Sequence, residues 1–197
     1  MKRFVINLFT ALGLFVIAGC AAPRQAITLD ADAFHQHIST IYVMPVIDGR
    51  NDKSAKLDDT DFKRIREMTK EKLEKHGYQT VLVDSWGAGA AISDQSLADM
   101  SAAELSGLAP VESKIFLIIT INDIHDKWKV FSASYSITGT AMAIDRGKKT
   151  EIWKDAATGA ESSTGILGAM GAQIGKADDA QHTLLRQVFA SFPKNIK

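Results

Sequence analysis

The sequence predicts an α/β (α+β) fold in which three helices pack on a mixed sheet of about five strands, in the order β-α-β-α-β-β-β-α. Runs of β-branched and aromatic residues alternate with amphipathic segments in the first half of the chain. The strand, helix and strand expected over residues 40–84 are typical of a right-handed crossover between parallel strands. Two further strands and an amphipathic helix follow over residues 132–192, which completes helices and strands packed around one core.

The first predicted strand, residues 40–47, is rich in β-branched and aromatic side chains, which favours a strand covered on both faces. Pro45 lacks an amide donor, so we expect it near the end of the strand or at an edge. The helix that follows is expected to begin after Asp58 or Asp59, either of which can cap it, and to end near His76.

One face of this helix carries apolar side chains at helical spacing, and the other face interleaves basic and acidic residues, as a solvated surface does. Gly77 then ends the helix, and residues 78–84 return as a second strand. Asp58, Asp59 and Asp61 resemble calcium ligands only superficially, because the glycine and the terminal glutamate of a calcium-binding loop are missing. Helix capping explains these three residues better.

The second half of the chain is expected to hold most of the sheet. Residues 115–121 form the most apolar run and are expected to lie at its centre. Alternating serine and threonine residues in the next strand predict one solvated face. The predicted elements are a short helix with a capping box at Ser101 and Glu104, strands at 115–121, 132–144 and 150–157, a hairpin turn at 145–149, and a helix at 178–192.

The start of the chain has the layout of a secretory signal. Two basic residues precede a nearly apolar stretch, which ends in small residues before Cys20, the one cysteine of the chain. This ending resembles a bacterial lipobox, in which cleavage before the cysteine frees its amino group for acylation and its sulfur carries a diacylglycerol. The stretch is shorter than a membrane-spanning helix requires. We therefore expect a lipoprotein signal peptide at 1–19, a lipidated tether at 20–39 and one domain at 40–197.

Composition excludes several classes of function. The chain carries 23 basic and 23 acidic residues, and removing residues 1–19 removes two basic ones, so the mature protein is nearly neutral. Such a balance gives no reason to propose nucleic acid as a partner. No cysteine follows Cys20, so no internal disulfide is expected. The motifs indicate neither a cofactor nor a metal ion.

A glycine-rich segment at residues 165–175 is the second informative feature. Its small residues recur every three or four positions, a spacing that lets two helices approach closely. Glycine disfavours an isolated helix, so a partner protein, the domain itself or a lipid surface would have to order this segment. A loop that packs two apolar side chains is the alternative. The candidate contact residues are Gly168, Gly171 and Gly175.

Two groups of residues that include histidine are candidate chemical sites. Asp123, His125 and Asp126 follow the apolar strand, and a histidine paired with either aspartate could serve as a general base. The sequence has no Gly-x-Ser-x-Gly nucleophile motif, so a polar turn at the strand end is the favoured prediction for these residues. His35 and His37 could share one face of a strand and bind zinc, but no cysteine completes the set.

Three stretches of the mature chain carry a resemblance to a known group. They are Tyr42-Val-Met-Pro-Val46, the helix end and strand at residues 73–81, and the apolar run at 115–121. With them, residues 40–192 resemble the small outer-membrane lipoproteins related to the amino-terminal domain of TolB, which include CsgG-type and LpoB-type proteins. The glycine-rich segment is similar to one in uncharacterised lipoproteins of this group. The resemblance implies a non-catalytic envelope protein that docks onto partners or self-assembles.

The expected function is that of a lipid-anchored accessory or assembly subunit in a cell-envelope transport or surface-assembly complex. Its partners would be the membrane, through acyl chains such as palmitate on Cys20, and envelope proteins or further copies of itself. Ala21 follows the cysteine in place of the aspartate that often retains lipoproteins at the inner membrane. We therefore expect an outer-membrane anchor with the domain in the periplasm. The alternatives are a periplasmic hydrolase that uses His125 with Asp123 or Asp126, and a carrier of lipids or small molecules.

Overall fold

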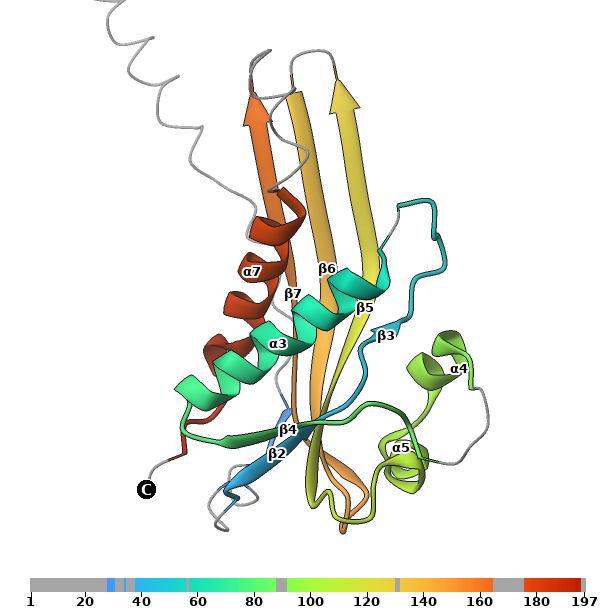
Figure 1. Ribbon diagram of the computed structural model, residues 1–197, viewed down its shortest axis with the longest axis vertical. Helices are drawn as coiled ribbons and strands as arrows, with labels where there is room; N and C mark the ends of the chain where they lie inside the picture. Colours follow the sequence, from blue (N-terminus) through green and yellow to red (C-terminus); the bar gives the residue numbers. More distant parts are fainter. Residues whose placement is uncertain are drawn as a thin grey trace, which may run out of the picture.

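The computed structural model describes residues 28–30, 34, 38–55, 57–87, 92–129, 132–164 and 176–195. These residues form one seven-stranded mixed sheet with helices packed on it (Figure 1). The strands are β1 (Thr28–Leu29), β2 (Thr40–Val43), β3 (Ile47–Asp48), β4 (Gln79–Leu82), β5 (Ile115–Lys129), β6 (Ser132–Asp145) and β7 (Thr150–Thr164). The helices are α3 (Asp59–Lys75), α4 (Asp94–Asp99), α5 (Ala102–Leu108) and α7 (Lys176–Val188), with a 3-10 turn at Phe189–Ser191.

The sheet confirms the predicted fold class and its mixed topology. Its strand order is β1-β7-β6-β5-β2-β4, and β3 also pairs with β5. The predicted crossover is confirmed, because β2 and β4 are parallel neighbours joined through α3. The apolar strand β5 is central, with β6 antiparallel on one side and β2 and β3 parallel on the other.

Several predicted boundaries are confirmed because local capping fixes them. Asp58 caps α3 by accepting hydrogen bonds from the backbone amides of Thr60 and Asp61, and the Asp61 side chain accepts one back from Asp58. His76 is the C-cap, and Gly77 follows it with a φ of 90°, a conformation that favours glycine. The predicted capping box of Ser101 and Glu104 lies at the start of α5.

Other predictions need correction. The expected strand at 40–47 is divided into β2 and β3, because Pro45 lies between them and has no amide to give to the ladder. Helix α4, capped by Ser93, was not predicted. The last helix ends at Val188 and continues only as the 3-10 turn. Strands β5 and β7 run to Lys129 and Thr164, well beyond the predicted ends at 121 and 157.

Two hydrophobic clusters cover opposite faces of the sheet. Ile115 and Leu117 of β5 belong to the larger cluster, under α3 and α7, whereas the alternate residues Phe116 and Ile118 belong to the smaller one, under α4 and α5. The larger cluster is rich in aromatic rings, and the ring centroid of Trp153 lies 4.7 Å from that of Phe192. In the described part of the chain, no helix combines the length and apolar character that crossing a membrane requires.

Candidate interaction surface

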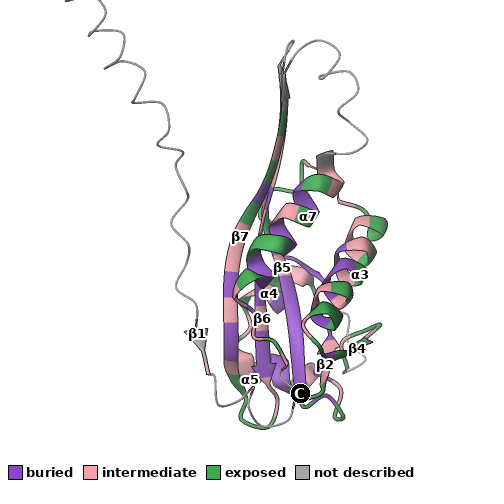
Figure 2. Ribbon diagram, turned by 90° about the vertical axis from the view of Figure 1, so that its left-hand side faces the viewer, coloured by how far each residue is buried: buried purple, intermediate pink, exposed green. Residues whose placement is uncertain are grey.

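Strands β5, β6 and β7 continue past the rest of the sheet as a three-stranded extension (Figure 1). Strands β2 and β3 pair with β5 only as far as Ile121, and β1 pairs with β7 only at Trp153 and Lys154. We call the part beyond these contacts the arm: residues 122–129, 132–139 and 157–164. Its end reaches past α7 and α3 (Figure 2).

A β-bulge sets the faces of the arm. The pairing of β5 with β6 shifts by one residue between Ile121, which faces Gly139, and Asp123, which faces Thr138. Successive side chains of a strand point to opposite faces, so residues three apart would face opposite sides. Ile121 and Ile124 are nevertheless both buried. The extra residue, Asn122, absorbs the mismatch, and its side-chain amide donates a hydrogen bond of 2.7 Å to Thr140 Oγ1.

The inner face of the arm is partly covered by the helical layer. Ile124 and Ile137 are buried there, and Tyr135 is half-buried, which raises the pKa of its hydroxyl to about 12. At the same level, the buried Gln181 of α7 donates a 3.2 Å hydrogen bond to Asp61 of α3. Polar contacts therefore join α3 and α7 beside the inner face.

The outer face of the arm is open and lined by short polar side chains. Thr138 and Thr158 lie across from each other on β6 and β7, with their hydroxyl oxygens 2.9 Å apart. The exposed residues of this face are His125, Lys127, Ser134, Thr158, Ala160 and Ser162. Over β6 and β7 this face therefore carries few bulky side chains, so another surface can approach it closely.

The structure brings together two of the three residues considered as an acid–base site. His125 Nε2 lies 2.8 Å from Asp123 Oδ2 on the outer face, whereas Asp126 faces Tyr135 on the opposite side of the sheet. The predicted turn at a strand end is wrong for these residues, because β5 continues through them to Lys129. Ser136 lies across from His125 in register, but no hydrogen bond joins the two side chains. The side chains of His125 and Asp123 are 61% and 46% exposed, so the pair sits on open surface.

A buried ion pair that the sequence did not reveal holds the segment after β3. Arg50 donates from Nε to Asp48 Oδ1 at 2.7 Å and from its second terminal nitrogen to Oδ2 at 2.9 Å. The guanidinium also donates to the carbonyl oxygen of Ala55 at 2.5 Å. These hydrogen bonds lower the pKa of Asp48 and raise that of Arg50. Two charged residues in a polar loop usually face solvent, so the pattern gave no signal of burial.

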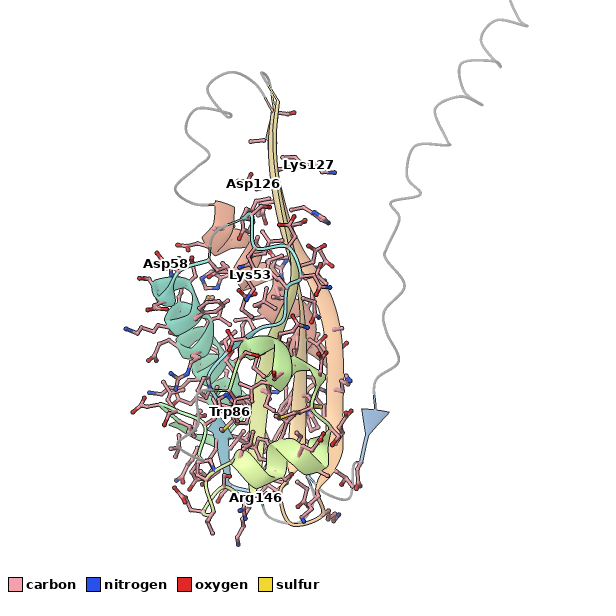
Figure 3. All side chains as sticks on the ribbon, turned by 90° about the vertical axis from the view of Figure 1, so that its right-hand side faces the viewer. Lys53, Asp58, Trp86, Asp126, Lys127 and Arg146 are labelled. Carbon is pink, nitrogen blue, oxygen red and sulfur yellow. The ribbon has the colours of Figure 1, made fainter. Side chains whose placement is uncertain are left out.

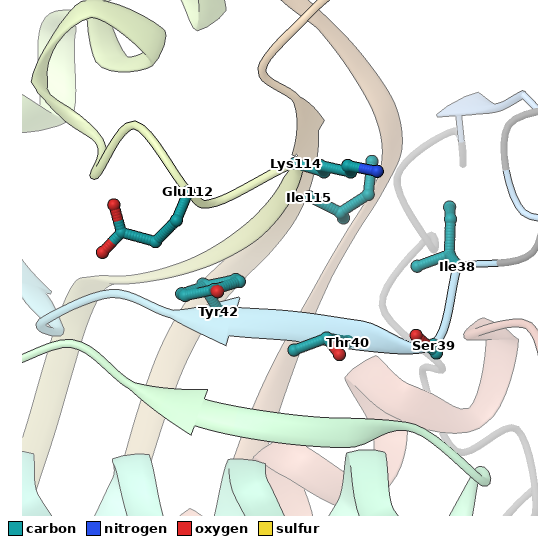
Figure 4. Close-up of a pocket in the computed structure, with 7 residues that line it drawn as sticks. All are labelled: Ile38, Ser39, Thr40, Tyr42, Glu112, Lys114 and Ile115. Atoms are coloured by element: carbon teal, nitrogen blue, oxygen red, sulfur yellow. The ribbon is translucent and has the colours of Figure 1, made fainter.

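A small cavity lies at the other end of the molecule from the arm. Its volume is about 280 Å³, and Tyr42, Glu112 and Lys114 bring polar groups to its walls (Figure 4). Arg146 marks this end of the molecule, and Asp126 and Lys127 lie on the arm at the opposite end (Figure 3). None of the residues that line the cavity is a catalytic, metal-binding or contact candidate from the sequence.

The remaining predicted site residues fall into two groups. Asp58 and Asp61 serve as helix-capping residues, as expected. Within the described ranges, no three histidine, cysteine, aspartate or glutamate side chains gather as a metal site would require. Cys20, the pair His35 and His37, and the contact residues Gly168, Gly171 and Gly175 lie outside the described residues.

Comparison with known proteins supplies structural likenesses alone. No protein-family model matches the chain. No curated protein matches its sequence. Among solved structures, lipoprotein GNA1162 from Neisseria meningitidis is similar, with a TM-score of 0.46 and 15% identity over 64% of this chain and 84% of that one.

Two further structures extend this likeness. A PelC dodecamer from Paraburkholderia phytofirmans has a TM-score of 0.46 and 10% identity, covering 77% of this chain and 86% of that one. The LpoB C-terminal domain from Salmonella enterica has a TM-score of 0.37 and 15% identity, covering 61% and 82%. The chain is thus structurally similar to a bacterial lipoprotein and to a domain of an LpoB-type protein, the kinds of protein that the sequence resembles.

Proposed function

We propose that this protein is a lipid-anchored envelope lipoprotein that acts without catalysis, as an accessory or assembly subunit of a transport or surface-assembly complex. The acyl chains on Cys20 would hold it at the outer membrane, with the domain in the periplasm. The observation that carries the proposal is the arm, whose exposed outer face carries small hydroxyl and methyl groups on β6 and β7 beside His125 and Lys127 of β5. Such a surface suits contact with a protein partner or with another copy of the chain.

The size of this face indicates how it would work. Eight residues at about 3.3 Å each and three strands at about 4.8 Å spacing give roughly 380 Å². A standard protein interface buries about 800 Å² on each partner, so the arm alone would bind weakly. Anchoring both partners to one membrane raises their effective concentration and offsets a weak contact. The lipid anchor and the arm therefore serve the same function in this proposal.

The test is in-cell crosslinking, followed by identification of the captured proteins. Ala160→Arg places a long charged side chain at an exposed position on the outer face, and we expect capture of partners or of further copies to fall at least fivefold. Val111→Arg is the matched control, because Val111 is 81% exposed and lies outside the arm. Equal capture by both variants, with unchanged unfolding midpoints, would remove the arm from the proposal.

The glycine-rich segment forms a second part of the proposal. It follows β7 directly at the end of the arm, since Thr164 is the last residue of that strand. We expect bulky substitutions at Gly168, Gly171 or Gly175, such as leucine, to reduce co-purification with envelope partners. Ala160→Arg and the glycine variants test separate surfaces, so an effect of one set without the other identifies which surface makes the contact.

Hydrolysis is a second candidate function, and the contact between His125 and Asp123 is the observation that favours it. Both side chains of the pair are open to solvent, and Ser136 lies opposite His125 in register. A panel of esters and glycans, offered to the wild type and to His125→Ala, separates the two functions. Turnover that His125→Ala abolishes would establish hydrolysis, and no turnover by the wild type would remove it.

A further inference from the structure

The outer face of the arm holds three rows of side chains that run across the strands. Each row takes one residue from β5, one from β6 and one from β7. From the end of the arm inward, the rows are Lys127 with Ser134 and Ser162, His125 with Ser136 and Ala160, and Asp123 with Thr138 and Thr158. We call them the first, second and third rows. Each row therefore has a titratable side chain on β5 and small side chains on the other two strands.

The charges at the two ends of this face have opposite signs. Lys127 points away from the helical layer near the end of the arm (Figure 3). Asp123 lies on the same face, four residues earlier in β5, and contacts His125 at 2.8 Å. Among the described residues, no acidic side chain lies within ion-pair distance of Lys127. The face therefore presents an ammonium group that has no acidic partner in the described part of its own chain.

The bulge at Asn122 places both charges on the outer face. Without the extra residue, Asp123 and Lys127 would share the face of Ile121, which is buried in the larger hydrophobic cluster. The bulge instead exposes charges of both signs beside the small residues of β6 and β7. Such a pattern is typical of a surface that contacts one of complementary charge.

We propose that the outer face docks on the same face of a second copy of the chain, about a twofold axis that crosses the strands at the level of His125. This inference rests on the proposed assembly function and specifies its partner. An axis in this position makes the strands of the two arms antiparallel and lays the first row of each copy on the third row of the other. Lys127 of each copy then lies opposite Asp123 of the other copy, which gives two ion pairs for each dimer.

Charge distinguishes this axis from other symmetric arrangements of the two faces. An axis that crosses the strands at Asp123, or at Lys127, brings two like charges together. An axis parallel to the strands lays β5 of one copy on β7 of the other, so that Lys127 meets Ser162 and gains no carboxylate. Of the axes that cross the strands, only the one at His125 gives Lys127 an acidic partner.

The small residues of β6 and β7 suit the same arrangement. Ser134 and Ser162 of one copy lie over the two threonines of the third row in the other, so hydroxyl groups that both donate and accept hydrogen bonds face each other. In the second row, Ala160 lies over Ala160 of the other copy. Such small side chains let the sheets approach at least as closely as the roughly 10 Å between packed sheets. An extended lysine and an aspartate together span that distance.

The area of the contact indicates where the dimer forms. The face covers roughly 380 Å² on each copy, about half of what a standard interface buries. Exposed ion pairs add little affinity, but they select the partner and fix the register. Copies anchored in one membrane meet at a high effective concentration, so we expect the dimer at the membrane surface.

Zero-length crosslinking tests the ion pair directly. Full-length, processed protein labelled with the light and the heavy nitrogen isotope is mixed in equal amounts in vesicles of phosphatidylethanolamine and phosphatidylglycerol. A carbodiimide then joins ammonium and carboxylate groups that are in contact. We expect an amide between Lys127 and Asp123, with about half of its molecules joining a light peptide to a heavy one. Lys148 and Asp30, which lie 3.7 Å apart in one chain, are the internal control, and their product must never mix isotopes.

The isotope pattern separates the outcomes. If the control product forms and no product joins Lys127 to Asp123, the proposal is overturned. A product of Lys127 and Asp123 that never mixes isotopes places the crosslink within one chain and also overturns it.

Reversal of the charges gives a second readout. Lys127→Asp and Asp123→Lys each set like charges opposite one another, so crosslinking between two differently tagged copies in cells should fall at least fivefold. The double variant restores opposite charges and should recover to within twofold of the wild type. Lys63→Asp is the matched control, because Lys63 is exposed on α3, on the other side of the sheet, and should change nothing.

The double variant also separates this inference from the proposed function. Single variants without effect, or a double variant that stays as low as the single ones with an unchanged unfolding midpoint, would overturn the dimer. Capture of a different envelope protein that Ala160→Arg abolishes, without a product of Lys127 and Asp123, would support the proposed function and overturn this inference.

Discussion

At Gly159, the backbones of β7 and α7 meet with no room for a side chain between them. A methyl group at this position would overlap the carbonyl oxygen of Ala180 and would lie 2.5 Å from the amide nitrogen of Leu184. This close approach lets Ala180 and Leu184 become fully buried against the sheet. Gly159 carries no local signal of this role in the sequence, because its importance depends on contacts with Ala180 and Leu184, which lie more than 20 residues later in the chain.

We therefore expect Gly159→Ala to lower the free energy of unfolding by about 3 kcal/mol, because backbone atoms on both sides must move. Gly107→Ala is the matched control: no atom outside its own helix lies within 4 Å of the added methyl group. Alanine is the better helix former, so this control should be neutral or stabilising by up to about 1 kcal/mol. Urea unfolding measures both, and similar effects of the two substitutions would contradict the close packing of α7 on β7.

The buried pair of Asp48 and Arg50 makes a prediction about acid stability. The folded protein holds the pKa of Asp48 below its unfolded value of about 3.9. A lowered pKa contributes stability that is fully present above the unfolded pKa and is lost as the pH falls through the folded one. Asp48→Asn should remove this part of the acid dependence below about pH 4.

At neutral pH, Asp48→Asn should also cost about 3 kcal/mol, since it leaves the buried guanidinium of Arg50 without its charge partner. The double variant Asp48→Asn with Arg50→Met removes both charges and should recover part of the loss. Unfolding free energies from pH 2 to pH 7 test both statements. If the single and double variants were equally unstable, an unpaired buried charge would not be the cause.

At the scale of elements, the bulge at Asn122 explains which parts of the fold could be predicted. Helices α3 and α5 have local caps, and their ends were predicted within a residue or two. The β6 part of the arm was predicted, within the strand at 132–144, but the extensions of β5 and β7 were not. The polar residues of β5 alternate in register with β6 only after the bulge at Asn122 resets the faces. Helix α4 was missed because it is six residues long and buries a single leucine, Leu97, which gives no helical periodicity.

Because of the bulge, we also expect two single-residue deletions in β5 to lower the free energy of unfolding by different amounts. Deleting Asn122 removes the extra residue and leaves Ile121 and Ile124 facing the core, so the cost is about 1 kcal/mol for one lost hydrogen bond. Deleting Thr120 turns the side chain of Ile121 to the opposite face of the sheet and should lower the free energy of unfolding by at least about 3 kcal/mol. Unfolding free energies of the two deletion variants test this, and equal costs would mean that the bulge does not set the faces of the arm.

At the scale of the whole molecule, the two ends have different character. The end with α4 and α5 carries a second hydrophobic cluster on the face that α3 and α7 leave open, so the sheet is covered on both sides there. The arm has a covered inner face and an open outer face. The candidate site was therefore predictable only in part: the contact of His125 with Asp123 was considered, but the surface that carries it depends on β5 and β7 being longer than the pattern indicated.

The last prediction concerns the anchor on which the proposed function depends. Trypsin should release residues 20–24 of the processed chain as one peptide, because Arg24 is the first basic residue after the signal. We expect this peptide to start at Cys20 and to carry the mass of a diacylglycerol and an amide-linked acyl chain. The intact protein should partition into the detergent phase, since each buried methylene contributes about 0.8 kcal/mol and a processed lipoprotein carries several chains.

Residues 21–197 behind an ordinary cleavable secretion signal form the control, and should partition into the aqueous phase with the same unfolding midpoint. An unmodified Cys20, or a mature chain that retains residues 1–19, would contradict lipidation and leave the arm without the membrane that makes its weak contacts effective.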